Sequence, residues 1–188
     1  MIEHLRLKSK LRVFLCVVTI LIALLSSLVL QPLELFYPSV LIAVLLVWMS
    51  FIDIERHILP NPLTYGLVII GLIWASIYHL SDLGHHIIGA VIGYGLIATI
   101  AWYYIKKRGI AGIGLGDAKL LAAAGAWLGW IGIPYVLLIS SLSGLLLSIS
   151  LMITKRSFDL KQRIAFGPHL AVGFWLVWLF QDRFSLLL

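Results

Sequence analysis

The sequence has 188 residues, of which 62% are hydrophobic and only 12% carry a formal charge. Soluble globular domains contain about 45–50% apolar and about 25% charged residues, so this composition excludes an ordinary soluble protein and indicates a membrane protein. Basic residues outnumber acidic ones by 14 to 8, and the one cysteine excludes both an intramolecular disulfide and a zinc site with paired cysteines.

Seven apolar runs follow one another along the chain. A helix needs about 20 apolar residues to cross a bilayer, and most of the runs approach that length. They predict an all-α, polytopic membrane bundle of about six to seven transmembrane helices, in which residues 13–188 form a single integral-membrane domain. The runs cover residues 13–31, 39–53, 62–80, 86–105, 119–133, 134–153 and 167–181.

The N-terminal residues 1–12 are basic and precede an uncharged run from Val13 to Leu30. This run is longer than the core of a signal peptide and lacks a small-residue cleavage site, so it is predicted to stay in the protein as the first span. Residues 1–12 are then a basic cytoplasmic segment.

Basic residues divide unevenly between the two sides of the predicted bundle. With a cytoplasmic N-terminus, 13 of the 14 lysines and arginines lie on the cytoplasmic side and only Arg183 lies on the other. The positive-inside rule then predicts a multi-pass protein of the inner (plasma) membrane in this orientation. The basic excess reflects topology and does not indicate nucleic-acid binding. Anionic lipid is the expected partner of the basic loops.

Two acidic residues lie where an apolar run meets a predicted cytoplasmic loop. Asp53 closes the second run and Asp117 opens the fifth, 64 positions later. Ionisable groups at the edge of a span are costly and indicate function. Since both aspartates lie at one face of the membrane, their carboxylates can meet. Close carboxylates do not both ionise readily, so one can stay protonated while the other activates water for peptide hydrolysis, without metal or cofactor.

Other interpretations of these residues remain open from the sequence alone. Taken singly, each aspartate can be a helix-end acid solvated at the membrane interface. Paired membrane-edge acids also suit a small ion or proton transporter. Glu55 follows Asp53 by two residues and is predicted to lie off its helix face. Gly114 and Gly116 give the approach to Asp117 a backbone that can adopt conformations other residues avoid.

With both aspartates in place, the sequence resembles the type IV prepilin peptidases, which are membrane-embedded aspartic proteases of the GxGD type. Three segments carry the resemblance, which covers about residues 39–180. They are FIDIERHILPNPLT around Asp53, GIGLGDAKLLAAAGAWLGW around Asp117, and FGPHLAVGFW from Phe166 to Trp175.

The resemblance implies an aspartic endopeptidase with Asp53 and Asp117 as catalytic residues and with Gly114, Gly116 and Glu55 as loop or substrate-binding residues. Its substrates would be type IV prepilins or related pseudopilins of pili and protein secretion. It would cut their short basic leader at the cytoplasmic membrane face, just before the hydrophobic helix. No metal and no cofactor is expected, and no feature of the sequence specifies an oligomeric state.

The longer members of that family carry an additional amino-terminal span and a cytoplasmic region with paired cysteines, which is associated with N-methylation of the product. This sequence has 12 residues ahead of its first apolar run and a single cysteine, Cys16. Methyltransferase activity is therefore not expected of this chain.

Overall fold

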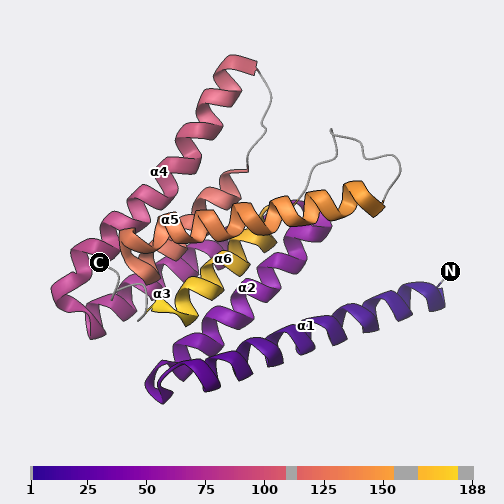
Figure 1. The fold of residues 1–188 in the computed structure, drawn as a ribbon, viewed down its shortest axis with the longest axis horizontal. Coiled ribbons are helices and arrows are strands. Elements are labelled where there is room, and N and C mark those ends of the chain that lie inside the picture. Colours follow the sequence, from indigo (N-terminus) through magenta and orange to yellow (C-terminus); the bar gives the residue numbers. More distant parts are fainter. Residues whose placement is uncertain (1, 109–113, 155–164, 182–188) are drawn as a thin grey trace.

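A computed structural model describes residues 2–108, 114–154 and 165–181, with side chains from residue 14 onward and without that of residue 108. Over these ranges the chain forms α-helices and short 3₁₀ turns and contains no strand, which confirms the predicted all-α class (Figure 1). The elements are α1 (Ile2–Leu30), η1 (Leu33–Leu35), α2 (Phe36–Arg56), α3 (Asn61–Tyr78), η2 (Leu80–Asp82), α4 (Leu83–Arg108), α5 (Leu115–Thr154) and α6 (Gly167–Leu179).

Several of these helices have the length and hydropathy of membrane spans. Four described segments qualify, namely Leu33–Arg56, Asn61–Tyr78, Leu80–Lys107 and Leu115–Thr154, and two shorter apolar helices cover Phe14–Leu30 and Gly167–Leu179. The protein is therefore a helical membrane protein. Helix α1 begins at Ile2, so the backbone of the basic N-terminal segment continues directly into the first apolar run.

The 40-residue α5 is two helices joined at Gly129. At about 1.5 Å per residue a straight helix of this length would be twice as long as the ~30 Å hydrocarbon core is thick. Gly129 has φ 73° and ψ 176°, a conformation that glycine adopts without a steric penalty, and the chain reverses there (Figure 1). The predicted break between the fifth and sixth runs is therefore present but lies four residues before the predicted boundary at residues 133 and 134, and Pro134 is already inside the second helix.

The first of the two helices of α5, which precedes Gly129, lies at the centre of the bundle. Small residues let the neighbouring helix α4 approach it closely. Gly89 of α4 faces Gly125 of α5, and a Cβ added to either would overlap the backbone of the other. One turn further along, a Cβ on Gly93 would lie 2.5 Å from the carbonyl oxygen of Leu121. Close backbone packing of this kind is how membrane helices associate without a hydrophobic drive between them.

Tryptophan hydrogen bonds connect helices at several points of the core. Trp127 of α5 donates from Nε1 to the carbonyl oxygen of Leu67 in α3 at 2.9 Å. Trp178 of α6 donates to Ser39 Oγ of α2 at 2.8 Å, and Gln31 donates from Nε2 to the carbonyl oxygen of Trp178 at 2.8 Å. The Trp178–Ser39 bond holds the end of α6 against the start of α2, and Gln31 holds it from the turn between α1 and η1. Since α2 and α6 run antiparallel, this contact also brings the end of α2 beside the start of α6.

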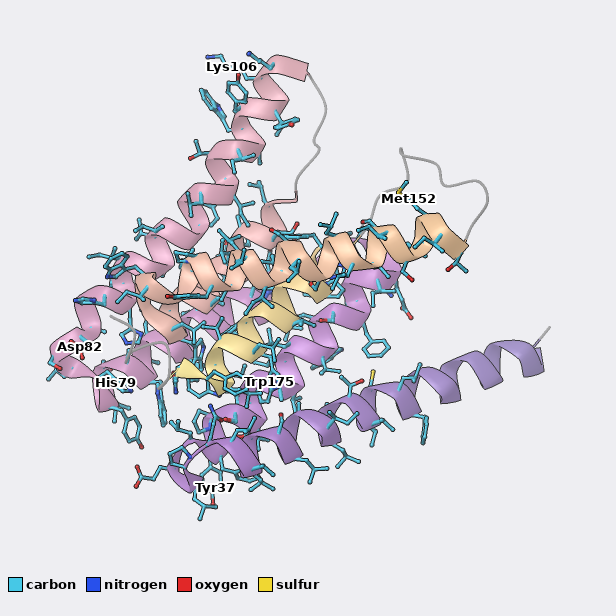
Figure 2. The ribbon with its side chains drawn as sticks, in the orientation of Figure 1. Tyr37, His79, Asp82, Lys106, Met152 and Trp175 are labelled. Atoms are coloured by element: carbon cyan, nitrogen blue, oxygen red, sulfur yellow. The ribbon has the colours of Figure 1, made fainter. Side chains whose placement is uncertain are left out.

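The two ends of the bundle differ in the residues they carry. Lys106 near the end of α4 and Met152 near the end of α5 lie at one end, while Tyr37, His79 and Asp82 lie at the other (Figure 2). The first end also contains the end of α2 and the starts of α5 and α6. It is the end that the sequence analysis predicts to face the cytoplasm.

Candidate active site

Asp53 lies in the last turn of α2 and is 6% exposed. The helix ends three residues later at Arg56, and the next residue, His57, adopts a left-handed conformation with φ 52° and donates its backbone N–H to the carbonyl oxygen of Asp53 at 2.8 Å. This cap stops α2 directly after the acid. The carboxylate is therefore carried on a helix, and the start of α6 packs against it.

Gly167, the first residue of α6, supplies the partner of the buried carboxylate. Its backbone N–H donates to Asp53 Oδ2 at 2.9 Å. A Cβ at this position would lie 2.7 Å from Oδ2 and 3.0 Å from Cγ of Asp53, so only glycine fits without a shift. Hydrogen bonds from backbone N–H groups to a carboxylate are among the stronger ones in proteins. The start of α6 therefore sets the position of the Asp53 side chain.

Asp117 lies in the first turn of α5 and is partly buried. Its backbone N–H donates to the carbonyl oxygen of Gly114 at 3.1 Å, and a Cβ on Gly114 would lie 3.5 Å from Asp117 Oδ2. The carboxylate is close enough to that of Asp53 for their negative charges to repel each other. The fold thus brings together the two acids that the sequence analysis selected, from opposite ends of two different helices.

Gly116 and Glu55, the other residues selected from the sequence, lie around the pair in different ways. Gly116 is inside α5 and packs against the segment between α2 and α3, where a Cβ would lie 3.0 Å from Leu59 Cβ. Glu55 is exposed on the last turn of α2 and faces α1, close enough to Cys16 for an electrostatic interaction. Gly116 therefore allows close packing beside Asp117, whereas Glu55 lies at the surface.

Lys119, the basic residue nearest in sequence to Asp117, contacts two residues of α3. Its Nζ donates to Asn61 Oδ1 and lies 5.1 Å from the centre of the Tyr65 ring. These contacts draw the ammonium group toward the start of α3. The same side chain thus fixes α3 against α5 beside the acidic pair.

Gly167 is the site residue that the sequence analysis did not select. Its contribution is a backbone N–H and the absence of a side chain, so no functional side chain marks it. The one signal was its position in the FGPHLAVGFW segment, where a glycine precedes a proline at the start of an apolar run. Within the described residues, no group of three or more His, Cys, Asp and Glu side chains is arranged to hold a metal ion.

The fold and this site define a polytopic helical membrane protein with two acidic side chains paired at one end of its bundle. The family model described as the type IV leader peptidase family matches residues 40–149, which include both acids. Since that match covers more than half of the chain, the protein belongs to the type IV leader peptidase family. No solved structure matches the chain.

Curated relatives carry the name "Prepilin leader peptidase/N-methyltransferase". The one from Aeromonas hydrophila is 40% identical over 149 residues, which cover 77% of this chain and 51% of the relative. The one from Escherichia coli strain K12 is 43% identical over 126 residues, or 66% and 55% of the two chains. That of Pseudomonas aeruginosa is 37% identical over 145 residues, or 75% and 50%. The chain thus spans about half the length of the relatives that it matches.

Proposed function

We propose that this protein is a membrane-embedded aspartic endopeptidase that removes the leader peptide of type IV prepilins or prepilin-like proteins. The observation that carries the proposal is the pairing of Asp53 and Asp117 at one end of the bundle, with Gly167 bonded to the first of them. Membership of the type IV leader peptidase family supports the same reaction. It favours the peptidase over the ion transporter that the sequence alone left open.

In the proposed reaction the two carboxyl groups hold a water molecule between them, and one of the two is protonated. The ionised carboxylate takes a proton from the water as its oxygen attacks the scissile carbonyl carbon, and the protonated acid gives its proton to the carbonyl oxygen. The tetrahedral intermediate then collapses. The carbon–nitrogen bond breaks, and the proton taken from water passes to the leaving amine. As the carbonyl re-forms, a hydroxyl proton of the intermediate returns to the other carboxylate, which restores the starting pair.

Gly167 has a defined part in this scheme. Its N–H holds Oδ2 of Asp53, which leaves Oδ1 to face the water. Because α2 and α6 are also held together at their other ends by Trp178 and Ser39, the carboxylate stays in one orientation while the substrate enters. Preorganisation of this kind lowers the barrier because the reacting groups need little further movement.

We also propose that the acids face the cytoplasm in the inner membrane, with the N-terminus on the same side. The distribution of basic residues along the sequence supports this orientation. A basic leader would meet an acidic site there, with Glu55 at the surface beside it, while the basic loops contact anionic lipid. Gly114, which lies against Asp117 and is exposed, would let the backbone of an extended substrate come close to the acids.

The test is co-expression of a candidate prepilin with the wild-type protein and its Asp53→Asn and Asp117→Asn variants, followed by measurement of the prepilin's size. We expect the wild type to shorten the prepilin and both variants to leave it intact. Asp82→Asn is the matched control, because Asp82 is an exposed acid at the opposite end of the bundle (Figure 2). Processing that persists in both active-site variants contradicts the proposed function.

A further inference from the structure

An apolar cleft of about 290 Å³ lies between α1, α2 and α6. In Figure 1, α1 diverges from α2 toward its N-terminal end. Its walls include Thr19 of α1, Ala43, Val47 and Phe51 of α2, and Pro168 and Val172 of α6. The proposed reaction has no part for this space.

The two hydroxyl groups in the wall of the cleft are used within their own helices. Thr19 donates to the carbonyl oxygen of Leu15 at 2.8 Å, and Ser50 donates to that of Leu46 at 2.7 Å. The remaining lining residues are apolar. Burying a polar group without a hydrogen-bond partner is costly, so the chemistry of the walls suits an aliphatic or aromatic occupant.

One end of the cleft lies near the contact between Gly167 and Asp53. Ser50 lies one helical turn before Asp53, and Pro168 directly follows Gly167, whose N–H donates to the Asp53 carboxylate. At about 1.5 Å per helical residue, Val172 lies about 7.5 Å beyond Gly167 along α6, and Ala43 lies about 15 Å from Asp53 along α2. The lining residues therefore extend from near Asp53 through about half of the ~30 Å hydrocarbon core.

We propose that this cleft binds the first turns of the substrate's hydrophobic helix, the part that follows the scissile bond. The inference rests on the proposed leader peptidase function and adds a binding site to it. A bond cut at Asp53 and Asp117 leaves the next residues at the mouth of the cleft, and those residues enter the membrane. The cleft has about twice the volume of the ~150 Å³ cavity that holds benzene, so it accepts a few apolar side chains of the helix.

The first experiment compares two substrates of the Val172→Trp variant. Val172 is 45% exposed, so a tryptophan there can extend into the cleft without displacing the core. One substrate is a full-length prepilin, and the other is a leader peptide that ends a few residues after the scissile bond. We expect KM to rise about tenfold for the full-length prepilin, the change that corresponds to ~1.4 kcal/mol of lost binding. The value of kcat/KM for the short peptide should stay unchanged.

The matched control is Val91→Trp, because Val91 is 66% exposed on α4, a helix that does not line the cleft. This variant should cleave both substrates like the wild type. If Val172→Trp leaves both substrates unaffected while the wild type cleaves them, the peptidase function stands and the cleft proposal is wrong. If the wild type cleaves neither substrate, the proposed function itself fails.

A second measurement does not depend on the tryptophan variant keeping its fold. A photoreactive amino acid replaces Val172 or Val91 in the Asp117→Asn protein, which is mixed with full-length prepilin in phospholipid vesicles and irradiated. We expect position 172 to crosslink to the hydrophobic helix of the prepilin and position 91 to lipid. Crosslinks from position 172 to lipid alone would assign the cleft to an acyl chain and overturn the proposal.

Discussion

The replacement of Gly167 by alanine tests whether the start of α6 positions the buried carboxylate. The added Cβ would lie 2.7 Å from Asp53 Oδ2, 3.0 Å from Cγ and 3.3 Å from Cβ. An ordinary van der Waals contact begins near 3.4 Å, so either the carboxylate or the start of α6 must move by about 0.7 Å. That movement also lengthens the 2.9 Å hydrogen bond between Gly167 N and Oδ2.

A misplacement of about 1 Å at reacting groups can reduce the rate about 100-fold, so Gly167→Ala is expected to lower kcat by between about tenfold and about 100-fold. Its effect on stability should be small by comparison, because alanine is favoured over glycine in helices by up to about 1 kcal/mol and offsets part of the weakened hydrogen bond. The assay is the initial rate of prepilin cleavage by the purified protein in detergent, together with its thermal unfolding temperature.

Gly144→Ala is the matched control, because Gly144 of α5 packs against the start of α6 two residues beyond Gly167. A Cβ there would lie 3.7 Å from the His169 ring, which is an ordinary contact, so the rate should stay close to that of the wild type. A Gly167→Ala variant that cleaves at the wild-type rate refutes the reasoning. Equal losses in both variants would assign the effect to general packing of α6 and refute it as well.

Two further predictions concern packing and chemistry. Gly125→Ala should destabilise the protein by about 1–3 kcal/mol, because the new Cβ overlaps the backbone of Gly89. Gly95→Ala is the control, because a Cβ at Gly95 has no atom within 4 Å, and it should leave the unfolding temperature in detergent unchanged or raised. Equal unfolding temperatures of the two variants would contradict the close contact between α4 and α5. The new N-terminus of a cleaved prepilin should stay unmethylated when this protein acts with S-adenosylmethionine; a mass increase of one methyl group in the product would overturn the expectation drawn from the single Cys16.

The helices and their order could be predicted from the sequence with little loss. Each apolar run became helix because a membrane-embedded backbone must satisfy its own hydrogen bonds. The prediction was wrong at the boundary between the fifth and sixth runs, because apolar residues continue without interruption through Gly129. The runs therefore placed the turn a few residues too late, and the positive φ of Gly129 in the structure fixed its position.

The acids were visible in the sequence because charge is scarce in this chain, and an aspartate at the end of an apolar run is costly enough to stand out. Their predicted place on one side of the membrane also followed from the order of the runs. What only the tertiary structure decided is how the pair is held, with α6 returning to place the N–H of Gly167 on Asp53 and α3 engaging Lys119. Every residue but proline has a backbone N–H, so the sequence does not mark the N–H of Gly167 as special. Its role arises because the end of α2 packs beside it, and the packing of all the helices together determines that contact.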